Sequence, residues 1–165
     1  FFWEERNRWF TDVWEDVRGR VQDLAGEALR DRAAAYPFEI PYRLINMYSV
    51  YGDTVLDPFW GTGTTTLAAM VAGRSSVGVE RHADLVEGFA ARAADAPRLS
   101  REVTAERLAD HADFVAGREA DHGYEAVHYD VPVRTKQERR IRLYEVDEVR
   151  ETEAGYVATH SPAER

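Results

Sequence analysis

The sequence predicts an α/β fold of the Rossmann-like kind, built on a parallel βαβ unit and followed by an antiparallel β meander. The first observation is that a short apolar strand, a turn punctuated by glycines and a helix-like segment follow one another over residues 54–72. The second is another apolar run at 75–80, which ends on Glu80. The third is an alternation of apolar and polar residues in the last forty residues, which is typical of strands with one buried face.

Residues that interrupt regular structure bound the βαβ unit. Gly52 and Asp53 favour a turn before the first strand, which we expect over 54–59. The turn DPFWGTGTTT covers residues 57–66, and a helix is expected over 67–72. Gly73 can adopt the left-handed conformation that ends a helix, and the second strand follows directly at 75–80.

The N-terminal region, 1–34, predicts one amphipathic helix. Its apolar side chains recur three or four residues apart and would form one face: Phe10, Val13, Trp14, Val17, Val21 and Leu24. Pro37 and Pro41 disfavour helix in the residues just before them. We therefore expect a second helix over 42–48, with Pro41 as its first helical residue.

Beyond Glu80 the sequence predicts helices first and strands last. A helix over 82–94 is expected to end before Pro97, and another over 100–118 to begin with Ser100 as its N-cap. Three regions carry a strand signal, over 127–133, 141–146 and 155–160. The chain then divides into an N-terminal helical region, 1–34, an α/β core, 35–120, and a β-rich extension, 121–165.

The glycine turn is suited to a ligand, because Gly61 and Gly63 carry no Cβ and the helix after them begins with unpaired amides. Thr64 stands where a phosphate-binding P-loop has lysine, and Thr66 where the dinucleotide fingerprint has its third glycine. Glu80, at the tip of the second strand, is placed to accept hydrogen bonds from two ribose hydroxyls. The pattern favours an adenosine-bearing ligand without a pyrophosphate over an ordinary βα turn that binds nothing.

Residues 35–81 closely resemble the S-adenosylmethionine-binding region of amino-group DNA methyltransferases, in the permuted class whose catalytic motif precedes the cofactor motifs. The segment DPFWGTGTT matches the family motif D-P-F-x-G-x-G-T-T. The segment 36–41 resembles the family's H-P-x-x-x-P motif, with tyrosine in place of the histidine. The resemblance implies a partial Rossmann-like S-adenosylmethionine-dependent methyltransferase fold, S-adenosyl-L-methionine as cofactor and DNA as partner.

The resemblance also implies a set of cofactor-binding residues: Tyr36, Pro37, Phe38, Asp57, Pro58, Phe59, Gly61, Gly63, Thr64, Thr65 and Glu80. Asp57 and the backbone that follows it would surround the methionine and sulfonium part of the cofactor. Thr64 and Thr65 would lie near its carboxylate, and the segment 36–41 would line its methionine end. Glu80 would hold the ribose.

The family's catalytic motif, [DNS]-P-P-[YFW], does not occur in the sequence, so no catalytic residue is assigned. In such enzymes this motif binds the protons of the target amine and stacks on the flipped base. Residue 1 is phenylalanine rather than methionine. We therefore expect the motif in a missing N-terminal portion or in a separate subunit.

The implied reaction is methyl transfer from S-adenosyl-L-methionine to an exocyclic amine of a DNA base, with cytosine N4 preferred over adenine N6 on overall likeness. The sequence contains no cysteine, which argues against carbon-5 methylation of cytosine, since that chemistry needs a cysteine nucleophile. Two alternatives remain open. One is an RNA guanosine methyltransferase with a similar cofactor turn, and the other is a non-catalytic cofactor-binding subunit or remnant.

Composition constrains the setting of the protein. The 165 residues carry a formal net charge of −9, and Lys136 is the one lysine among 21 basic residues. Many acidic residues with almost no lysine are typical of a salt-adapted, halophilic protein. High salt would also screen the repulsion between such an acidic surface and DNA. A GC-rich genome, which favours arginine over lysine, is the other explanation. The lack of a long apolar run predicts a cytoplasmic protein with no membrane span, and the scattered histidines predict no metal site.

Overall fold

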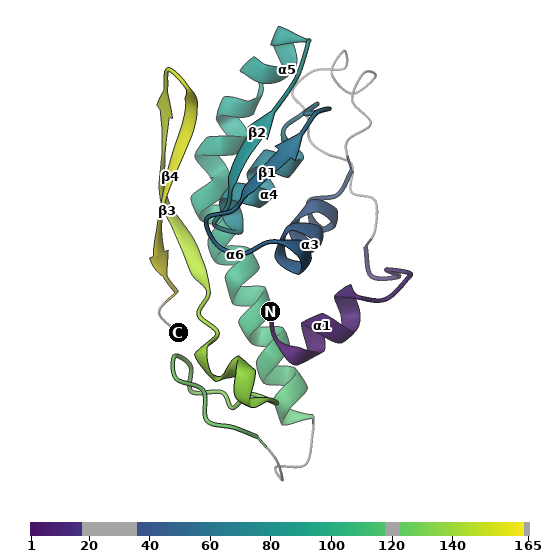
Figure 1. Ribbon diagram of the computed structural model, residues 1–165. Coiled ribbons are helices and arrows are strands. Elements are labelled where there is room, and N and C mark those ends of the chain that lie inside the picture. The colour runs from purple at the N-terminus through teal and green to yellow at the C-terminus, as the bar shows by residue number, and fades with distance from the viewer. Residues whose placement is uncertain (18–35, 118–122, 164–165) are drawn as a thin grey trace.

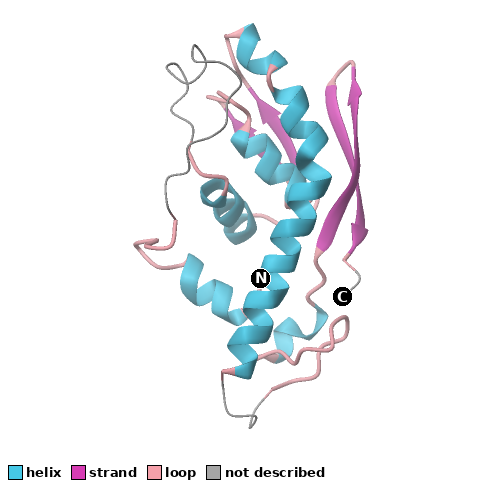
Figure 2. Cartoon of the chain, turned by 180° about the vertical axis from the view of Figure 1, so that it is seen from behind, coloured by secondary structure: helices cyan, strands magenta, loops and turns pink. Residues whose placement is uncertain are grey.

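Figure 1 shows the computed structural model of the chain, which describes residues 1–17, 36–117 and 123–163. The helices are α1 (Trp3–Trp9), α3 (Glu39–Tyr48), α4 (Thr64–Val71), α5 (Ala83–Glu87), α6 (Phe89–Ala116) and the 3₁₀ helix η1 (Lys136–Arg140). The strands are β1 (Thr54–Asp57), β2 (Ser75–Gly78), β3 (Tyr144–Thr152) and β4 (Gly155–Pro162). Helix α6 runs the length of the molecule between the two pairs of strands (Figures 1 and 2). The predicted region boundaries at residues 34 and 120 lie outside the described residues.

Strands β1 and β2 form the predicted parallel unit. They pair from Thr54↔Ser75 to Asp57↔Gly78, and α4 is the crossover between them. The strands end at residues 57 and 78 rather than at 59 and 80 as expected. Beyond them the backbone leaves the ladder to form the glycine turn, where the Trp60 N–H donates to the Val79 carbonyl at 3.0 Å.

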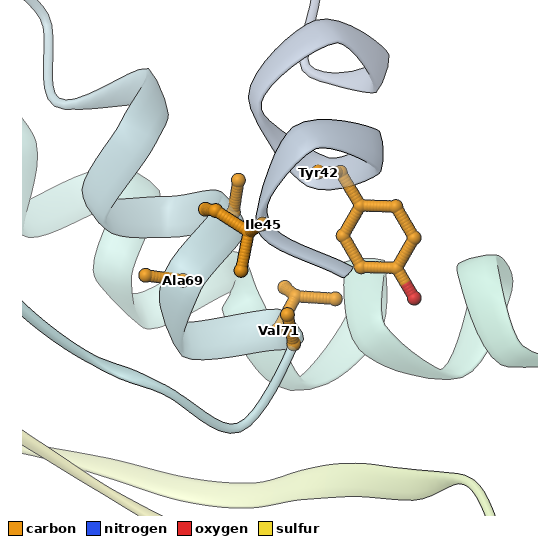
Figure 3. Close-up of a cluster of buried hydrophobic side chains, with 6 residues drawn as sticks. Tyr42, Ile45, Ala69 and Val71 are labelled. Carbon is orange, nitrogen blue, oxygen red and sulfur yellow. The ribbon is translucent and has the colours of Figure 1, made fainter. Parts of the chain in front are cut away.

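Helix α4 lies at the centre of the packing, because its small apolar residues let neighbouring helices approach closely. Ala69 is fully buried, and Figure 3 shows Tyr42 and Ile45 of α3 beside Ala69 and Val71 of α4. A second cluster joins α4 to the start of α6, where Phe89 is buried. The site at the first turn of α4 is therefore held by helices on two sides.

The continuity of α6 contradicts the predicted break before Pro97. The helix runs from Phe89 to Ala116 with Pro97 inside it. Proline inside a helix removes one backbone hydrogen bond and costs about 3 kcal/mol or more. Ala93 and Ala96, in the turn before Pro97, are buried against α4 and β3, and this packing outweighs the local cost.

The predicted N-terminal helix is wrong in extent, since α1 ends at Trp9 and residues 10–17 are not helical. The Thr11 hydroxyl lies 3.0 Å from the Arg8 carbonyl oxygen and 2.9 Å from that of Val13, a local arrangement that competes with helix. Val13 is 70% exposed instead of contributing to a buried face. Two positions of the predicted face lie outside the described residues, Val21 and Leu24.

Helix α3 begins at Glu39, so Pro41 is its third residue and not its first as predicted. A proline there is tolerated, because the first amides of a helix have no partner within the helix. Pro41 is also buried, so it contributes to the packing of the first turn of α3.

A buried ion pair joins α1 to α6. Two nitrogens of Arg107, Nε and Nη2, donate to the Glu5 carboxylate at 2.6 and 2.8 Å. The third, Nη1, donates to the Tyr42 hydroxyl of α3 at 3.0 Å. Burial raises the pKa of Glu5, but the Arg107 guanidinium outweighs this effect and leaves the pKa lowered. The bidentate geometry compensates the cost of removing both charges from water.

His111, one turn further along α6, links α1 to the segment before η1. Its ring stacks on Phe2 with the centroids 4.0 Å apart. Nδ1 lies 2.8 Å from a Glu4 carboxylate oxygen, and Nε2 lies 3.1 Å from the Pro132 carbonyl oxygen. Burial lowers the pKa of His111, but the Glu4 carboxylate and the Pro132 carbonyl outweigh it, so the pKa is raised. The protonated ring can donate to both oxygens at once.

The C-terminal region contains one antiparallel pair instead of the predicted meander. β3 and β4 pair from Tyr144↔Pro162 to Thr152↔Gly155. The predicted strand over 127–133 is wrong, because its one ladder contact in the described chain is the isolated bridge Tyr124↔Val133. Two of its apolar side chains, Tyr129 and Val133, pack instead into a cluster around Phe2.

Ser100 joins α6 to this pair and is not an N-cap as predicted. It is fully buried in the middle of α6, and its hydroxyl accepts the Val146 N–H of β3 at 3.0 Å. The β3–β4 pair therefore lies along α6, as Figure 2 shows from behind. The predicted class, a partial Rossmann-like α/β fold with an antiparallel β extension, is confirmed.

We expect the protein to lose stability as the pH rises above about 6.5, the ordinary pKa of histidine. The folded-state pKa of His111 is raised, so its stabilisation is complete below that pH and disappears as the pH passes the folded value. Urea unfolding at pH 6 and pH 8 measures the difference. In His111→Gln the difference should shrink, and an unchanged difference would contradict the assignment.

Gly63→Ala should destabilise the fold more than Gly52→Ala. Both glycines have positive φ, +75° and +85°, so each alanine incurs left-handed strain of about 1–2 kcal/mol. A Cβ on Gly63 would also lie 2.5 Å from Phe89 Cδ2, whereas one on Gly52 meets nothing within 4 Å. The crowding should add about 1–3 kcal/mol in denaturant unfolding. Equal losses in the two variants would refute the close packing at Gly63.

Candidate cofactor site

The turn between β1 and α4 is fixed by its own backbone. The Phe59 N–H donates to Asp57 Oδ1 at 3.0 Å, and the Gly63 N–H donates to the Trp60 carbonyl at 2.9 Å. Gly61 and Gly63 have φ values of +56° and +75°, which residues with a Cβ rarely adopt. The chain thereby reaches α4, whose first internal hydrogen bond runs from Leu67 to Gly63.

The side chain of Trp60 holds the turn in place. The sequence did not indicate this role, because Trp60 occupies a variable position of the D-P-F-x-G-x-G-T-T motif. Its indole N–H donates to the Thr66 hydroxyl at 2.7 Å. Its ring fills the space beside two glycines, since a Cβ on Gly78 would lie 1.9 Å from Trp60 Cδ1 and one on Gly63 2.8 Å from Cζ2. A glycine ending the second strand was the available signal for this close approach.

Asp57 has a buried carboxylate that is only half satisfied. The residue is 8% exposed, and while Oδ1 accepts the Phe59 N–H, Oδ2 is buried with no hydrogen-bond partner among the described residues. A buried carboxylate oxygen without a partner is costly, so it needs an explanation, and a binding or catalytic role is one. The arrangement is suited to a cationic or hydrogen-bond-donating ligand.

Glu80 ties the end of β2 to the glycine turn. Its Oε2 accepts the Gly61 N–H at 2.9 Å, and Oε1 accepts the N–H groups of Arg81 and His82 at 2.8 and 2.9 Å. The His82 amide, followed by those of Gly61 and Arg81, lowers the pKa of Glu80. The half-buried carboxylate therefore stays ionised, and its remaining lone pairs can accept hydrogen bonds from hydroxyl groups.

The predicted segment 36–38 meets the first turn of α4. The Tyr36 hydroxyl is hydrogen-bonded to the Thr65 hydroxyl at 2.5 Å. Phe38 stacks on Tyr42 with ring centroids 5.2 Å apart, which fixes the segment to α3. Tyr36 thus makes a direct contact with Thr65 in the first turn of α4.

Several of the predicted residues contact one another in pairs, whereas the side chains of Pro58 and Phe59 extend away from the other predicted residues. The pairs are Asp57 with Phe59, Glu80 with Gly61, and Tyr36 with Thr65. The side chain of Phe59 is 88% exposed, and Pro58 beside it is also exposed. These two side chains form the outer surface of the turn.

Two cavities flank the turn. One, of about 600 Å³, lies between α1, α3 and α6 and is bordered by Pro37, Phe38 and Arg92. The other, of about 680 Å³, lies between the βαβ unit and β4 and is bordered by Trp60 and Glu80. Three of the predicted site residues border these cavities, Pro37 and Phe38 the first and Glu80 the second, and the other predicted residues border neither.

Arg92 of α6 is a site residue that the sequence analysis missed. Its Nη1 donates to the Thr62 carbonyl at 2.7 Å, and both Nη atoms lie 3.3 Å from the Thr64 hydroxyl. The available signal was an arginine next to buried Ala93 and three residues after buried Phe89, which places a charge beside the apolar face of α6.

Two other kinds of site are absent from residues 1–17, 36–117 and 123–163. No three histidine, acidic or cysteine side chains of this part gather in a way that could hold a metal ion. None of its helices is both long and apolar enough to cross a bilayer.

Comparison with known proteins gives matches along most of the chain. A family model described as a DNA methylase matches residues 2–91. The chain is 51% identical over 144 residues to the type II methyltransferase M.MthZI of Methanothermobacter thermautotrophicus. This alignment covers 87% of this chain and 40% of M.MthZI. The chain is also 51% identical over 77 residues to M.MjaI of Methanocaldococcus jannaschii, covering 47% of this chain and 24% of M.MjaI.

Among solved structures, the DNA modification methylase TTHA0409 of Thermus thermophilus, complexed with S-adenosyl-L-methionine, matches with 35% identity and a TM-score of 0.42. That match covers 54% of this chain and 30% of TTHA0409.

The family match covers the features described above. Residues 2–91 include the segment 36–38, the glycine turn and Glu80, and they make up more than half of the chain. The chain spans 40% of the length of M.MthZI. On the match to the family model, which agrees with the motifs of the turn, the chain belongs to the DNA methylase family.

Proposed function

We propose that this chain binds S-adenosyl-L-methionine and forms part of an enzyme that methylates an exocyclic amine of a DNA base. The observation that carries the proposal is the unpaired, buried Oδ2 of Asp57 at the end of β1, beside a turn fixed by Glu80. Membership of the DNA methylase family and the 51% identity to the type II methyltransferase M.MthZI support it.

The two carboxylates fit different parts of this cofactor. Asp57 is buried and partly unpaired, so it would bind the positively charged methionine part. Glu80 is half-buried and its pKa is lowered, so it would accept the ribose hydroxyls as a carboxylate. The first turn of α4, with Thr64 and Thr65, would lie at the methionine carboxylate, next to Tyr36.

The contribution of this chain to the reaction would be positioning. When bound, the cofactor supplies an electrophilic methyl group on a sulfonium. The fixed turn and the segment 36–38 would hold that group in one orientation, so that the target amine can approach in line. An exocyclic amine is a weak nucleophile, so its placement matters as much as that of the methyl group. We infer cytosine N4 as the target in preference to adenine N6, on overall resemblance.

We infer that the residues presenting the base belong to a further portion of the protein or to a subunit, which would carry the [DNS]-P-P-[YFW] motif. The face of the parallel sheet turned away from α4 supports this proposal. Alternate residues of a strand point to opposite faces, and Val55 packs on the α3–α4 cluster, so Leu56 points away from it. Leu56, Val77 and Val79 are exposed, which leaves an apolar surface beside the turn.

Asp57→Asn should weaken binding of S-adenosyl-L-methionine by about 10- to 100-fold, because a charged hydrogen bond is lost while the acceptor for Phe59 is kept. Isothermal titration calorimetry of the purified chain measures the affinity. Asp113→Asn, at an exposed position near the far end of α6, is the matched control and should bind as the parent does. Unchanged affinity in Asp57→Asn would refute the cofactor assignment.

Expression of the complete gene should introduce N4-methylcytosine into host DNA, and Asp57→Asn should abolish it. Mass spectrometry of the digested nucleosides distinguishes the products. Detection of N6-methyladenine instead would support the proposed methyl transfer to an amine but show that the target base is adenine. If neither base is modified although the cofactor binds, DNA methylation is refuted.

A further inference from the structure

The guanidinium of Arg92 differs from those of the other arginines around the cavity between α1, α3 and α6. Four other arginines border this cavity, and each forms an ion pair with a carboxylate: Arg8 with Asp110, Arg43 with Asp16, Arg98 with Asp95 and Arg107 with Glu5. Arg92 has no carboxylate within 4 Å in the described part of the chain. Its partners are neutral oxygens, the Thr62 carbonyl and the Thr64 hydroxyl.

An unbalanced guanidinium in this position is costly to the folded state. Burial lowers the pKa of Arg92 from its ordinary value, and the nearby Tyr36 offsets this only in part. A charge removed from water normally needs a counter-charge in the same environment. A ligand that brings an anionic group would provide it.

The surroundings of Arg92 select a carboxylate from an amino-acid ligand. The guanidinium lies at the first turn of α4, where the helix dipole also favours negative charge. In the same turn of chain, Asp57 is more than nine-tenths buried and has an unpaired oxygen. The loop that begins at Asp57 thus has an unpaired carboxylate oxygen at one end and contacts the Arg92 guanidinium at the other, an arrangement complementary to a zwitterion.

We propose that Arg92 binds the carboxylate of the methionine part of S-adenosyl-L-methionine, opposite to the ammonium that Asp57 would hold. The inference rests on the proposed function, since it assigns a further residue to the same site. Arg92 belongs to α6, outside both cofactor motifs. A guanidinium carries five N–H donors in a fixed plane, so donors remain for a carboxylate beyond those used by Thr62 and Thr64.

A merely structural role is the competing explanation, because Arg92 also holds the Thr62 carbonyl and could do no more than fix the turn. The two roles differ in their response to the ligand. A structural clamp affects every ligand of the site equally. A carboxylate-binding residue affects only ligands that carry the carboxylate.

The test compares S-adenosyl-L-methionine with its decarboxylated analogue, which keeps the adenosyl, sulfonium and amine groups. Calorimetry on the parent chain should show the analogue binding about 10- to 100-fold more weakly, the loss expected for a charged hydrogen bond. Arg92→Gln should weaken S-adenosyl-L-methionine binding by a similar factor and leave the analogue within about 3-fold, so that the preference disappears. Arg101→Gln is the matched control, because Arg101 is exposed on the same helix and borders neither cavity. It should retain the full preference.

Equal weakening of both ligands in Arg92→Gln would overturn the proposal and leave Arg92 as a clamp. If Arg92→Gln does not fold, Arg92→Lys is measured with the same pair, and it should reduce the preference since an ammonium cannot form the planar fork. A parent chain that binds both ligands equally also overturns the inference but leaves the cofactor assignment intact. A parent chain that binds neither overturns the proposed function and the role of Arg92 with it.

Discussion

The contact of Trp60 with Gly63, Gly78 and Phe89 is the constraint on which the site depends. The indole occupies space that opens only because both glycines lack a Cβ, and its ring centroid lies 5.0 Å from that of Phe89 at the start of α6. This wedge joins the turn after β1 to the end of β2 and to the long helix. The positions of Asp57, of the glycine amides and of the first turn of α4 all follow from it. One tryptophan and two glycines thus fix the conformation of the turn.

Helix α6 carries this constraint through the rest of the chain. Phe89 packs under the turn, Ser100 binds β3, and Arg107 and His111 hold α1. Polar groups at three of these four points are buried, and each is paired, so the helix is fixed in rotation as well as in position. Packing along its length also explains why a proline is accepted in its middle. The turn and the N-terminal helix α1 are therefore connected through their contacts with α6.

Most of the arginines that the structure describes are exposed, but a few have internal roles in this acidic chain. Arg43 and Arg107 are buried in ion pairs, and Arg74 donates to the Ser49 carbonyl at 2.8 Å. In the basic run around η1, Arg139 donates to the Glu125 carbonyl and Lys136 lies over the Tyr124 ring. Arg92 stands apart, because its guanidinium is half-buried and has no acidic partner among the residues that the structure describes.

The sequence by itself determined the parallel βαβ unit, the antiparallel ending, the family and the residues of the turn. These features follow from local causes: apolar runs of strand length, glycines that permit positive φ, and a motif whose residues are adjacent in the chain. The tertiary structure decided the extent of the N-terminal helix, the continuity of α6 through Pro97 and the loss of the strand over 127–133. It also revealed Trp60 and Arg92, whose roles come from Gly78 and Thr62 at 18 and 30 residues' distance in the sequence. Contacts between distant segments set the energies in each of these cases, and local propensity does not contain them.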